Sequence, residues 1–121
     1  MTKRILIADD DDDALAGLAN LLNGMGYEVA LAANGAQAVE VAQQFAPEVV
    51  ILDLGMPMMD GLAAARALRN TPGGRGVLLV ALTGWGQPQH HEMTHDAGFD
   101  VHLVKPVSTD QLGFILSMTQ P

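Results

Sequence analysis

Five short apolar segments alternate with segments of helical character along this chain of 121 residues. One of them, EVVILD at residues 48–53, has no polar residue between its two ends. A strand this apolar is typically buried on both faces, as in a parallel sheet covered by helices. The other four are RILIA (4–8), YEVALA (27–32), VLLVALT (77–83) and FDVHLV (99–104). The alternation predicts an α/β fold, with a doubly wound, five-stranded parallel sheet and helices on both faces.

Helical periodicity fills the stretches between the apolar segments. Apolar residues recur every three or four positions from Leu15 to Met25, which is the spacing of one helix face. We expect this helix over residues 12–25, with Asp11 or Asp12 as its N-cap and Gly26 at its end. Further helices are expected at 36–45, at 61–70, from Pro88 onward, and from Ser108 to about Met118. Nothing in the pattern suggests a linker, so residues 1–121 are expected to form a single domain.

The charge balance is strongly acidic, with 14 Asp and Glu, 6 Lys and Arg, and a net charge of −8. Nucleic-acid binding needs clustered positive charge, so we expect no direct nucleic-acid partner. No apolar stretch approaches the roughly 18 residues of a membrane span. Only four apolar residues follow Arg4, too few for a signal peptide, so we expect a cytoplasmic chain without membrane insertion. The chain has no cysteine, which excludes disulfides and thiolate metal sites.

Polar side chains follow four of the predicted strands, where each strand ends. Asp9 and Asp10 follow the first, Asp53 ends the third, Thr83 ends the fourth and Lys105 follows the fifth. In an open parallel sheet all these ends lie at one edge, where such folds bind their ligands. We therefore expect the five side chains to form one site.

The residue types at this edge indicate phosphoryl-transfer chemistry. Three carboxylates and one ammonium carry a formal charge of about −2, which a hard divalent cation such as Mg²⁺ would balance. With the metal bound, Asp53 could act as a nucleophile and form an acyl phosphate. The Lys105 ammonium and the Thr83 hydroxyl would then stabilise charge on the transferring oxygens.

Four motifs in this order resemble the receiver domain of two-component response regulators. They are ILIADD, ILDLGMPMMDG, ALTG and LVKP, and the resemblance covers essentially the whole chain. It implies a flavodoxin-like sheet with strand order 2-1-3-4-5. The segments ALTGWGQP and GFDVHLVKP are especially similar to receivers attached to hybrid histidine kinases, which would make the chain one domain of a longer protein.

The resemblance implies a role for each acidic residue of the site. Asp53 matches the aspartate that accepts the phosphoryl group. Asp10 matches a direct Mg²⁺ ligand, and Asp9 matches an acidic residue that acts largely through water. The backbone carbonyl of Gly55 matches a further metal contact, so the implied metal site consists of Asp9, Asp10, Asp53 and Gly55.

The remaining motif positions match the residues that respond to phosphorylation. Thr83 matches the hydroxyl that moves toward the phosphoryl group, and Lys105 matches the lysine of the site. A cis peptide bond is implied between Lys105 and Pro106. His102 departs from the family, because Tyr or Phe is usual three residues before the lysine. An imidazole at this switch position could still change rotamer.

The implied function is a phospho-accepting signalling switch rather than an enzyme with an external substrate. Its donor would be phosphohistidine on a histidine kinase or a histidine phosphotransfer protein, as in a phosphorelay. Self-phosphorylation and slow self-dephosphorylation would need Mg²⁺. No DNA-binding segment follows in the sequence, so we expect output through a partner or through another part of a longer protein.

The residues of the site argue against two alternative functions. A receiver-like interaction module that takes no phosphate would be expected to lack site residues, yet Asp9, Asp10, Asp53, Thr83 and Lys105 are all present. A hydrolase of the haloacid dehalogenase type also forms an aspartyl phosphate. That chemistry needs a second aspartate two residues after the nucleophile, where this chain has Gly55.

Overall fold

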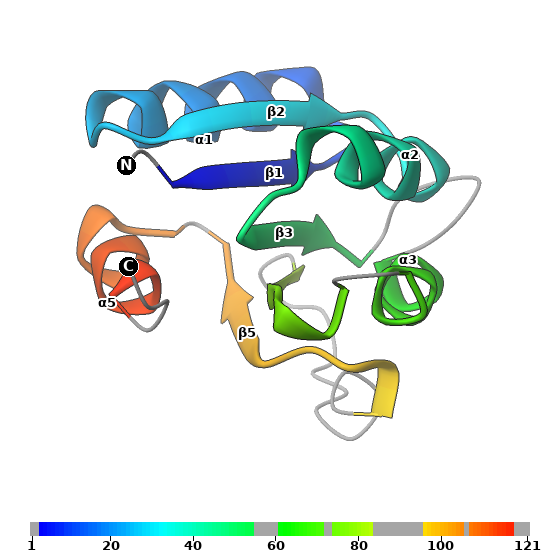
Figure 1. Cartoon of the computed structure of the whole chain (residues 1–121). Helices are drawn as coiled ribbons and strands as arrows, with labels where there is room; N and C mark the ends of the chain where they lie inside the picture. Colours follow the sequence, from blue (N-terminus) through cyan, green and yellow to red (C-terminus); the bar gives the residue numbers. More distant parts are fainter. Residues whose placement is uncertain (1–2, 55–60, 72–73, 84–95, 106, 118–121) are drawn as a thin grey trace.

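A five-stranded parallel sheet forms the centre of the molecule (Figure 1). The computed structural model describes residues 3–54, 61–71, 74–83, 96–105 and 107–117. The strands are β1 (Arg4–Ala8), β2 (Glu28–Ala32), β3 (Val49–Asp53), β4 (Leu78–Thr83) and β5 (Val101–Val104). They pair in parallel in the order β2-β1-β3-β4-β5. The predicted α/β class and strand order are therefore confirmed.

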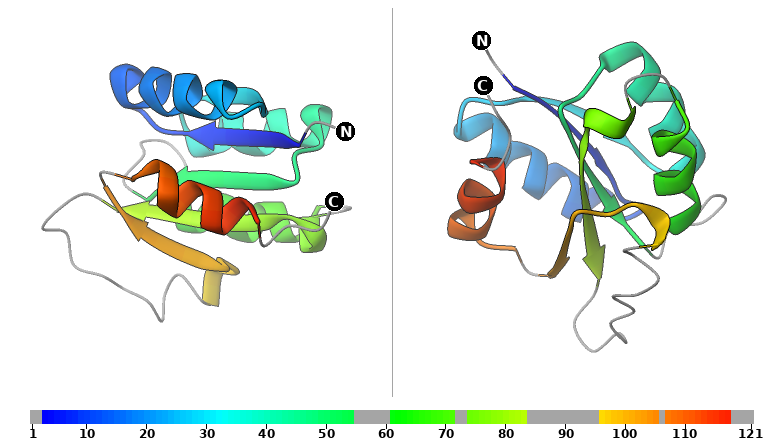
Figure 2. Two further views of the ribbon diagram at one scale, coloured as in Figure 1. Left: turned by 90° about the vertical axis from the view of Figure 1, so that its left-hand side faces the viewer. Right: turned by 60° about the horizontal axis from the view of Figure 1, so that its bottom comes forward.

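Helices cover both faces of this sheet, as Figure 2 shows. α1 (Asp12–Gly24) and α5 (Thr109–Leu116) lie on one face, and α2 (Gly35–Phe45) and α3 (Gly61–Arg69) lie on the other. A short 3₁₀ turn, η1 (Gly74–Gly76), precedes β4 where the sequence predicted only a loop. The helix predicted to begin at Pro88 lies outside the described residues.

Side-chain caps define where the helices begin. The Asp11 carboxylate accepts hydrogen bonds from the backbone N–H groups of Asp13 (3.0 Å) and Ala14 (3.3 Å), so Asp11, rather than Asp12, is the N-cap of α1. Asn34 caps α2, and Ser108 forms a capping box with Gln111 at α5. Such caps satisfy backbone donors that a helix start leaves without an intrahelical acceptor.

The hydrophobic core has two layers, one on each side of the sheet. β3 is buried along its whole length, which explains its uninterrupted apolar sequence. One layer packs α1 and α5 against the sheet through Leu15, Ala19, Leu22, Leu112, Ile115 and Leu116. The other packs α2 and α3 against it through Ala38, Ala64, Ala65 and Leu68. Each helix therefore buries one stripe of its surface and exposes the rest.

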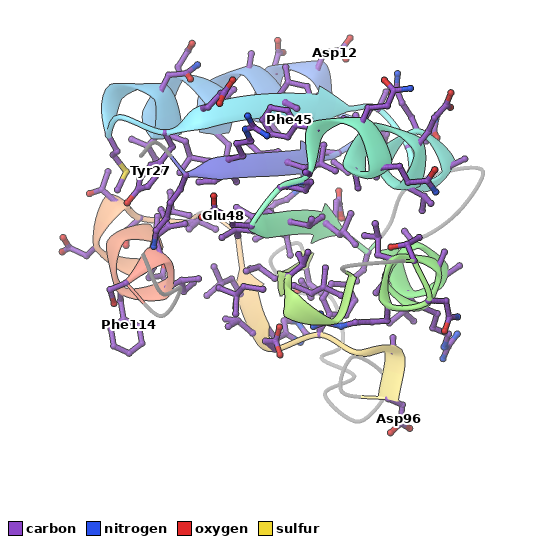
Figure 3. The ribbon with its side chains drawn as sticks, viewed as in Figure 1. Asp12, Tyr27, Phe45, Glu48, Asp96 and Phe114 are labelled. Atoms are coloured by element: carbon purple, nitrogen blue, oxygen red, sulfur yellow. The ribbon has the colours of Figure 1, made fainter. Side chains whose placement is uncertain are left out.

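Among the described residues, two large apolar side chains are exposed. Phe114 of α5 is 70% exposed and points away from the molecule (Figure 3), and Leu31 of β2 is 44% exposed. None of the helices in the described residues is long and apolar enough to cross a membrane.

Candidate functional site

The strand ends bring polar side chains from four strands to one edge of the sheet. Asp9 directly follows β1, Asp53 ends β3, Thr83 ends β4 and Lys105 directly follows β5. The register aligns these ends: Asp53 lies opposite Leu82, and Thr83 lies opposite Val104. The convergence expected from the strand pattern is therefore present in the structure.

Asp9 is the most deeply buried carboxylate at this edge, with 3% of its surface exposed. Its Oδ1 accepts the backbone N–H of Asp11 at 3.0 Å, and its Oδ2 accepts Lys105 Nζ at 2.8 Å. Its own backbone N–H donates to the Ala32 carbonyl. Both carboxylate oxygens are thus held in place before any ligand arrives.

Lys105 lies between two buried carboxylates. Its Nζ contacts Asp9 Oδ2 at 2.8 Å and Asp53 Oδ2 at 3.2 Å. The side chains of Asp9 and Asp53 are 4% and 12% exposed, and that of Lys105 is 30% exposed. The Lys105 backbone N–H donates to the Thr83 carbonyl at 2.9 Å, which fixes the chain as it leaves β5. One cation therefore joins the ends of β1, β3 and β5.

Asp53 is also approached closely by the backbone at the start of α3. A Cβ atom at Gly61 would lie 2.7 Å from the Asp53 carbonyl oxygen and 2.9 Å from the Leu54 Cα. Real Cβ atoms do not approach backbone atoms so closely, so only glycine permits this packing. Gly61 thereby helps position the end of β3.

The ion pairs shift the pKa values of both partners. Burial raises the pKa of Asp9, but hydrogen bonds from Lys105 and from the Asp11 backbone outweigh it, so the pKa lies below its ordinary value of 3.8. Burial lowers the pKa of Lys105, but the Asp9 hydrogen bond and the Asp53 charge outweigh it, so the pKa lies above 10.5. Both groups are therefore charged at neutral pH.

The lowered pKa of Asp9 predicts a specific acid sensitivity. The unfolded chain binds this proton more strongly than the folded one, so Asp9 stabilises the fold above pH 3.8. That contribution is lost as pH falls through the lower, folded-state pKa. Urea unfolding of Asp9→Asn should therefore show a smaller loss of stability between about pH 6 and pH 3 than wild type. The exposed Asp96 (Figure 3) supplies the control Asp96→Asn, and equal losses in all three proteins would contradict the expectation.

Three carboxylates at this edge lie close enough to share a metal ion. One oxygen each from Asp9, Asp10 and Asp53 lies within 4.8 Å of the others. Asp10 is exposed, whereas Asp9 and Asp53 are buried. Hard oxygen donors on a partly open site suit Mg²⁺, which keeps several of its waters. The residues present therefore fit that ion. Gly55 and Pro106, predicted as a metal contact and as a cis-proline, lie outside the described residues.

The Thr83 hydroxyl contacts His102 on the neighbouring strand. The distance from Thr83 Oγ1 to His102 Nε2 is 3.2 Å, and that to the Leu103 carbonyl oxygen is 3.5 Å. Thr83 is 4% exposed. The sequence identified both residues separately but did not predict their contact, because it depends on the register of β4 against β5.

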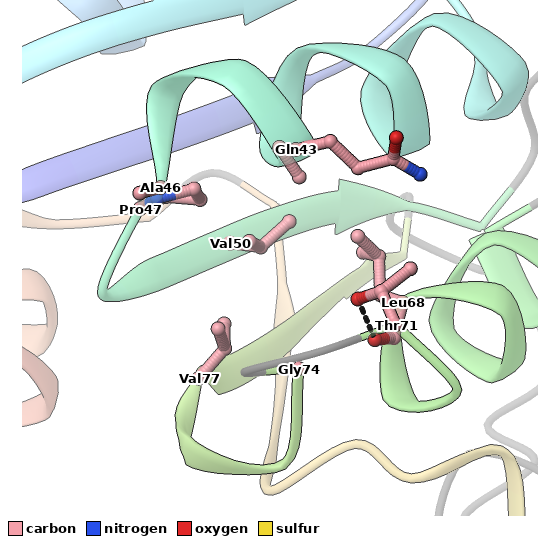
Figure 4. A pocket seen from close by; sticks show the side chains of 9 residues that line it. Gln43, Ala46, Pro47, Val50, Leu68, Thr71, Gly74 and Val77 are labelled. Carbon is pink, nitrogen blue, oxygen red and sulfur yellow. Dashed lines mark hydrogen bonds between the residues drawn. The ribbon is translucent and has the colours of Figure 1, made fainter.

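The described surface includes a hollow beside the site and a second, larger one away from it. One, of about 360 Å³, lies beside the site, and Asp9, Lys105, Leu18 and Val107 contribute to its wall. The larger one, of about 570 Å³, is lined by residues from the ends of α2 and α3 and the start of β3, and Figure 4 shows it. Gln43 and Thr71 are its polar side chains, and the Thr71 hydroxyl donates to the Leu68 carbonyl. Among the described residues of its lining, none has a side chain that titrates near neutral pH.

Comparison with known proteins assigns the chain to a family. Residues 5–116 match the response regulator receiver domain. The chain belongs to this family. The receiver domain is 39% identical over 111 residues to the transcriptional regulatory protein PdtaR of Mycobacterium tuberculosis, covering 91% of this chain and 53% of that protein. It is 37% identical over 103 residues to PrrA of Mycobacterium bovis, covering 85% and 43%. The chain thus spans about half the length of these curated relatives.

Solved structures of receiver domains have the same architecture. The chemotaxis protein CheY4 of Vibrio cholerae superimposes with a TM-score of 0.91 at 28% identity, covering 99% of this chain and 100% of that one. The receiver domain of the sensor histidine kinase PA1611 of Pseudomonas aeruginosa gives 0.89 at 30% identity, covering 98% of each. The PA1611 structure contains a magnesium ion coordinated in its active-site cleft. Both a chemotaxis protein and a kinase receiver are therefore similar to this chain.

Proposed function

We propose that this receiver domain is a phospho-accepting switch in which Asp53 takes a phosphoryl group from a phosphohistidine donor. The observation that carries the proposal is the contact of Lys105 Nζ with both Asp53 and Asp9 beside a third carboxylate. A lone strand-end aspartate would need none of these neighbours. We take residues 1–121 as one receiver domain, and the resemblance further implies that it acts in the cytoplasm.

Asp9, Asp10 and Asp53 are proposed to hold Mg²⁺, together with the backbone carbonyl of Gly55. The close approach of the three carboxylates supports this, as does the ion in the similar PA1611 receiver. When bound, Mg²⁺ would reduce the repulsion between the carboxylates and the incoming anion. The fixed Asp9 carboxylate and the exposed Asp10 carboxylate supply the remaining negative charge that attracts the cation.

The chain's own groups then carry out the transfer. An oxygen of the Asp53 carboxylate forms a bond to phosphorus, the bond from phosphorus to the donor histidine nitrogen breaks, and the imidazole leaves. Lys105 Nζ already lies 3.2 Å from Asp53 Oδ2, so its ammonium can stabilise the negative charge that develops on the phosphoryl oxygens. The second hydrogen bond of this ammonium, to Asp9 Oδ2 at 2.8 Å, holds it in position.

Signalling would follow from the new charge at Asp53. The Thr83 hydroxyl, at the end of the adjacent strand, would turn toward the phosphoryl group and shift an equilibrium between two states of the domain. The face that includes β5 and α5 would change with it and bind an output partner. The donor would be a histidine kinase or a histidine phosphotransfer protein. The rival proposal, an interaction module that takes no phosphate, leaves the Lys105 contacts unexplained.

Phosphoryl uptake is expected to depend on Mg²⁺. With acetyl phosphate as donor, intact mass should show one added phosphoryl group in the presence of Mg²⁺, and at least about tenfold less with EDTA. Asp10→Asn should raise the Mg²⁺ concentration for half-maximal uptake by at least about tenfold, because it removes an exposed metal ligand. Equal uptake with EDTA and with Mg²⁺ would contradict the proposed metal site. Absence of any adduct, even with a phosphorylated histidine donor, would contradict the proposed function.

A further inference from the structure

The hydrogen bond between Thr83 and His102 joins the last residue of β4 to the neighbouring strand β5. His102 lies opposite Ala81, and Thr83 lies two residues further along β4. Side chains two residues apart in a strand point to the same face. The imidazole of His102 therefore lies on the same face of the sheet as the Thr83 hydroxyl and meets it at 3.2 Å.

The two described contacts of the Thr83 hydroxyl both come from β5. They are His102 Nε2 at 3.2 Å and the Leu103 carbonyl at 3.5 Å, and the second is at the outer limit of a hydrogen bond. Asp53 lies on β3, and β4 separates β3 from β5 in the sheet order. To approach a phosphoryl group on Asp53, Thr83 Oγ1 must turn away from β5. The His102 bond must then break.

We propose that His102 is a positioning residue that holds the Thr83 hydroxyl against β5 and so competes with the phosphoryl group for it. The inference rests on the proposed function, because it concerns how the same site is regulated. It assigns His102 a definite effect: the imidazole biases the domain toward its unphosphorylated state. A phosphoryl oxygen still prevails, because hydrogen bonds to charged acceptors are roughly twice as strong as neutral ones.

The size of this bias follows from what one hydrogen bond contributes. A neutral, partly buried hydrogen bond typically changes an equilibrium by about 2- to 10-fold. In the wild type, a group that needs the Thr83 hydroxyl can bind only if this hydrogen bond breaks, and the free energy required lowers the apparent affinity of the site for that group. Removal of the imidazole nitrogen should therefore tighten binding of a phosphoryl mimic by about 2- to 10-fold.

A double-mutant cycle tests the competition directly. Calorimetry would measure the affinity for beryllofluoride, a mimic of a phosphoryl group on a carboxylate, in the presence of Mg²⁺. The proteins are wild type, His102→Phe, Thr83→Ala and the double variant. His102→Phe keeps a ring of similar size without its nitrogens and should bind the mimic about 2- to 10-fold more tightly than wild type. In the Thr83→Ala background the same change should have no effect, because the competing hydroxyl is gone.

A conservative variant separates hydrogen bonding from packing. His102→Gln retains a polar group at similar reach, so its affinity should fall between those of wild type and His102→Phe. Urea unfolding of each variant checks that the fold is retained. The proposal is overturned if His102→Phe leaves the affinity unchanged or weakens it, or if the gain persists without Thr83. Failure of wild-type protein to bind the mimic or take up a phosphoryl group would overturn the proposed function as well.

Discussion

Replacement of Asp53 with asparagine is expected to reduce phosphoryl uptake by at least about a thousandfold. The amide oxygen of asparagine is not a nucleophile, and it cannot form an acyl phosphate. The side chain keeps its shape, and an amide oxygen can still accept a hydrogen bond from Lys105 Nζ, which lies 3.2 Å from Asp53 in the wild type. The loss should therefore be chemical and leave the fold intact. Intact mass after incubation with acetyl phosphate and Mg²⁺ measures it.

Asp96→Asn is the matched control for this experiment. It makes the same chemical change at an exposed carboxylate outside the site, so uptake should equal that of the wild type. Circular dichroism and urea unfolding would confirm that both variants fold. Uptake by Asp53→Asn at the wild-type rate would rule out Asp53 as the acceptor. Asp9 and Asp10 would then be the candidate acceptors.

Loss of the Arg69 guanidinium is expected to destabilise the fold strongly, because this group makes several hydrogen bonds between separate elements. Arg69 ends α3 and donates to the carbonyl oxygens of Gly98, Gly74 and Val77, at distances from 2.6 to 3.0 Å. It also pairs with the Asp100 carboxylate at 2.8 Å. That carboxylate in turn accepts the backbone N–H of Leu79 at 2.9 Å. One side chain therefore joins α3, η1 and the start of both β4 and β5.

Arg69→Met should lower the free energy of unfolding by about 2–4 kcal/mol. The variant keeps an apolar stem, but it leaves several part-buried carbonyl groups without the guanidinium donor. Arg69→Lys should recover only a small part of the lost free energy of unfolding, because a single ammonium cannot reproduce the planar set of donors of the guanidinium group. The Asp100 side chain is 43% exposed, so water can hydrate its carboxylate when Arg69 is removed, and loss of this ion pair should contribute little to the destabilisation. Urea unfolding provides the measurement, and a loss below about 0.5 kcal/mol for Arg69→Met would contradict this role.

Glycine at position 98 belongs to the same network. Its φ is +104°, and a Cβ there would lie 2.8 Å from the Arg69 Cγ. The guanidinium lies against this segment, because the Gly98 carbonyl accepts two of its hydrogen bonds. The space that Arg69 occupies is thus available only beside a residue without a side chain.

Much of the fold could be predicted from local sequence. EVVILD predicted a strand buried on both faces, and Val49–Asp53 is buried throughout. The aspartate run predicted an N-cap at Asp11 or Asp12, and Asp11 caps α1. The convergence of Asp9, Asp53, Thr83 and Lys105 followed from topology, because parallel strands end at one edge. The strand order itself came from the family resemblance rather than from local pattern.

The contacts that the sequence did not predict are those between distant segments. Thr83 and His102 are 19 residues apart, and their contact depends on the register between β4 and β5. Arg69 and Gly98 are 29 residues apart and meet only because α3 ends beside the segment leading into β5. Each residue alone has an ordinary local role, a strand-end hydroxyl or a basic residue in the last turn of a helix. Their partners are set by tertiary packing, which has no local sequence signal.

Chemical trapping would locate the phosphoryl group most directly. Borohydride reduces an acyl phosphate to an alcohol and releases inorganic phosphate, so a phosphorylated aspartate becomes homoserine. No Lys or Arg lies between Ile5 and Ala65, so the tryptic peptide ending at Arg66 contains every candidate acceptor, namely Asp9, Asp10 and Asp53. Fragmentation of this peptide by tandem mass spectrometry assigns the modified residue. The proposed function predicts homoserine at position 53 alone, formed only after incubation with donor and Mg²⁺. Homoserine at position 9 or 10, or an adduct that borohydride does not convert, would contradict it.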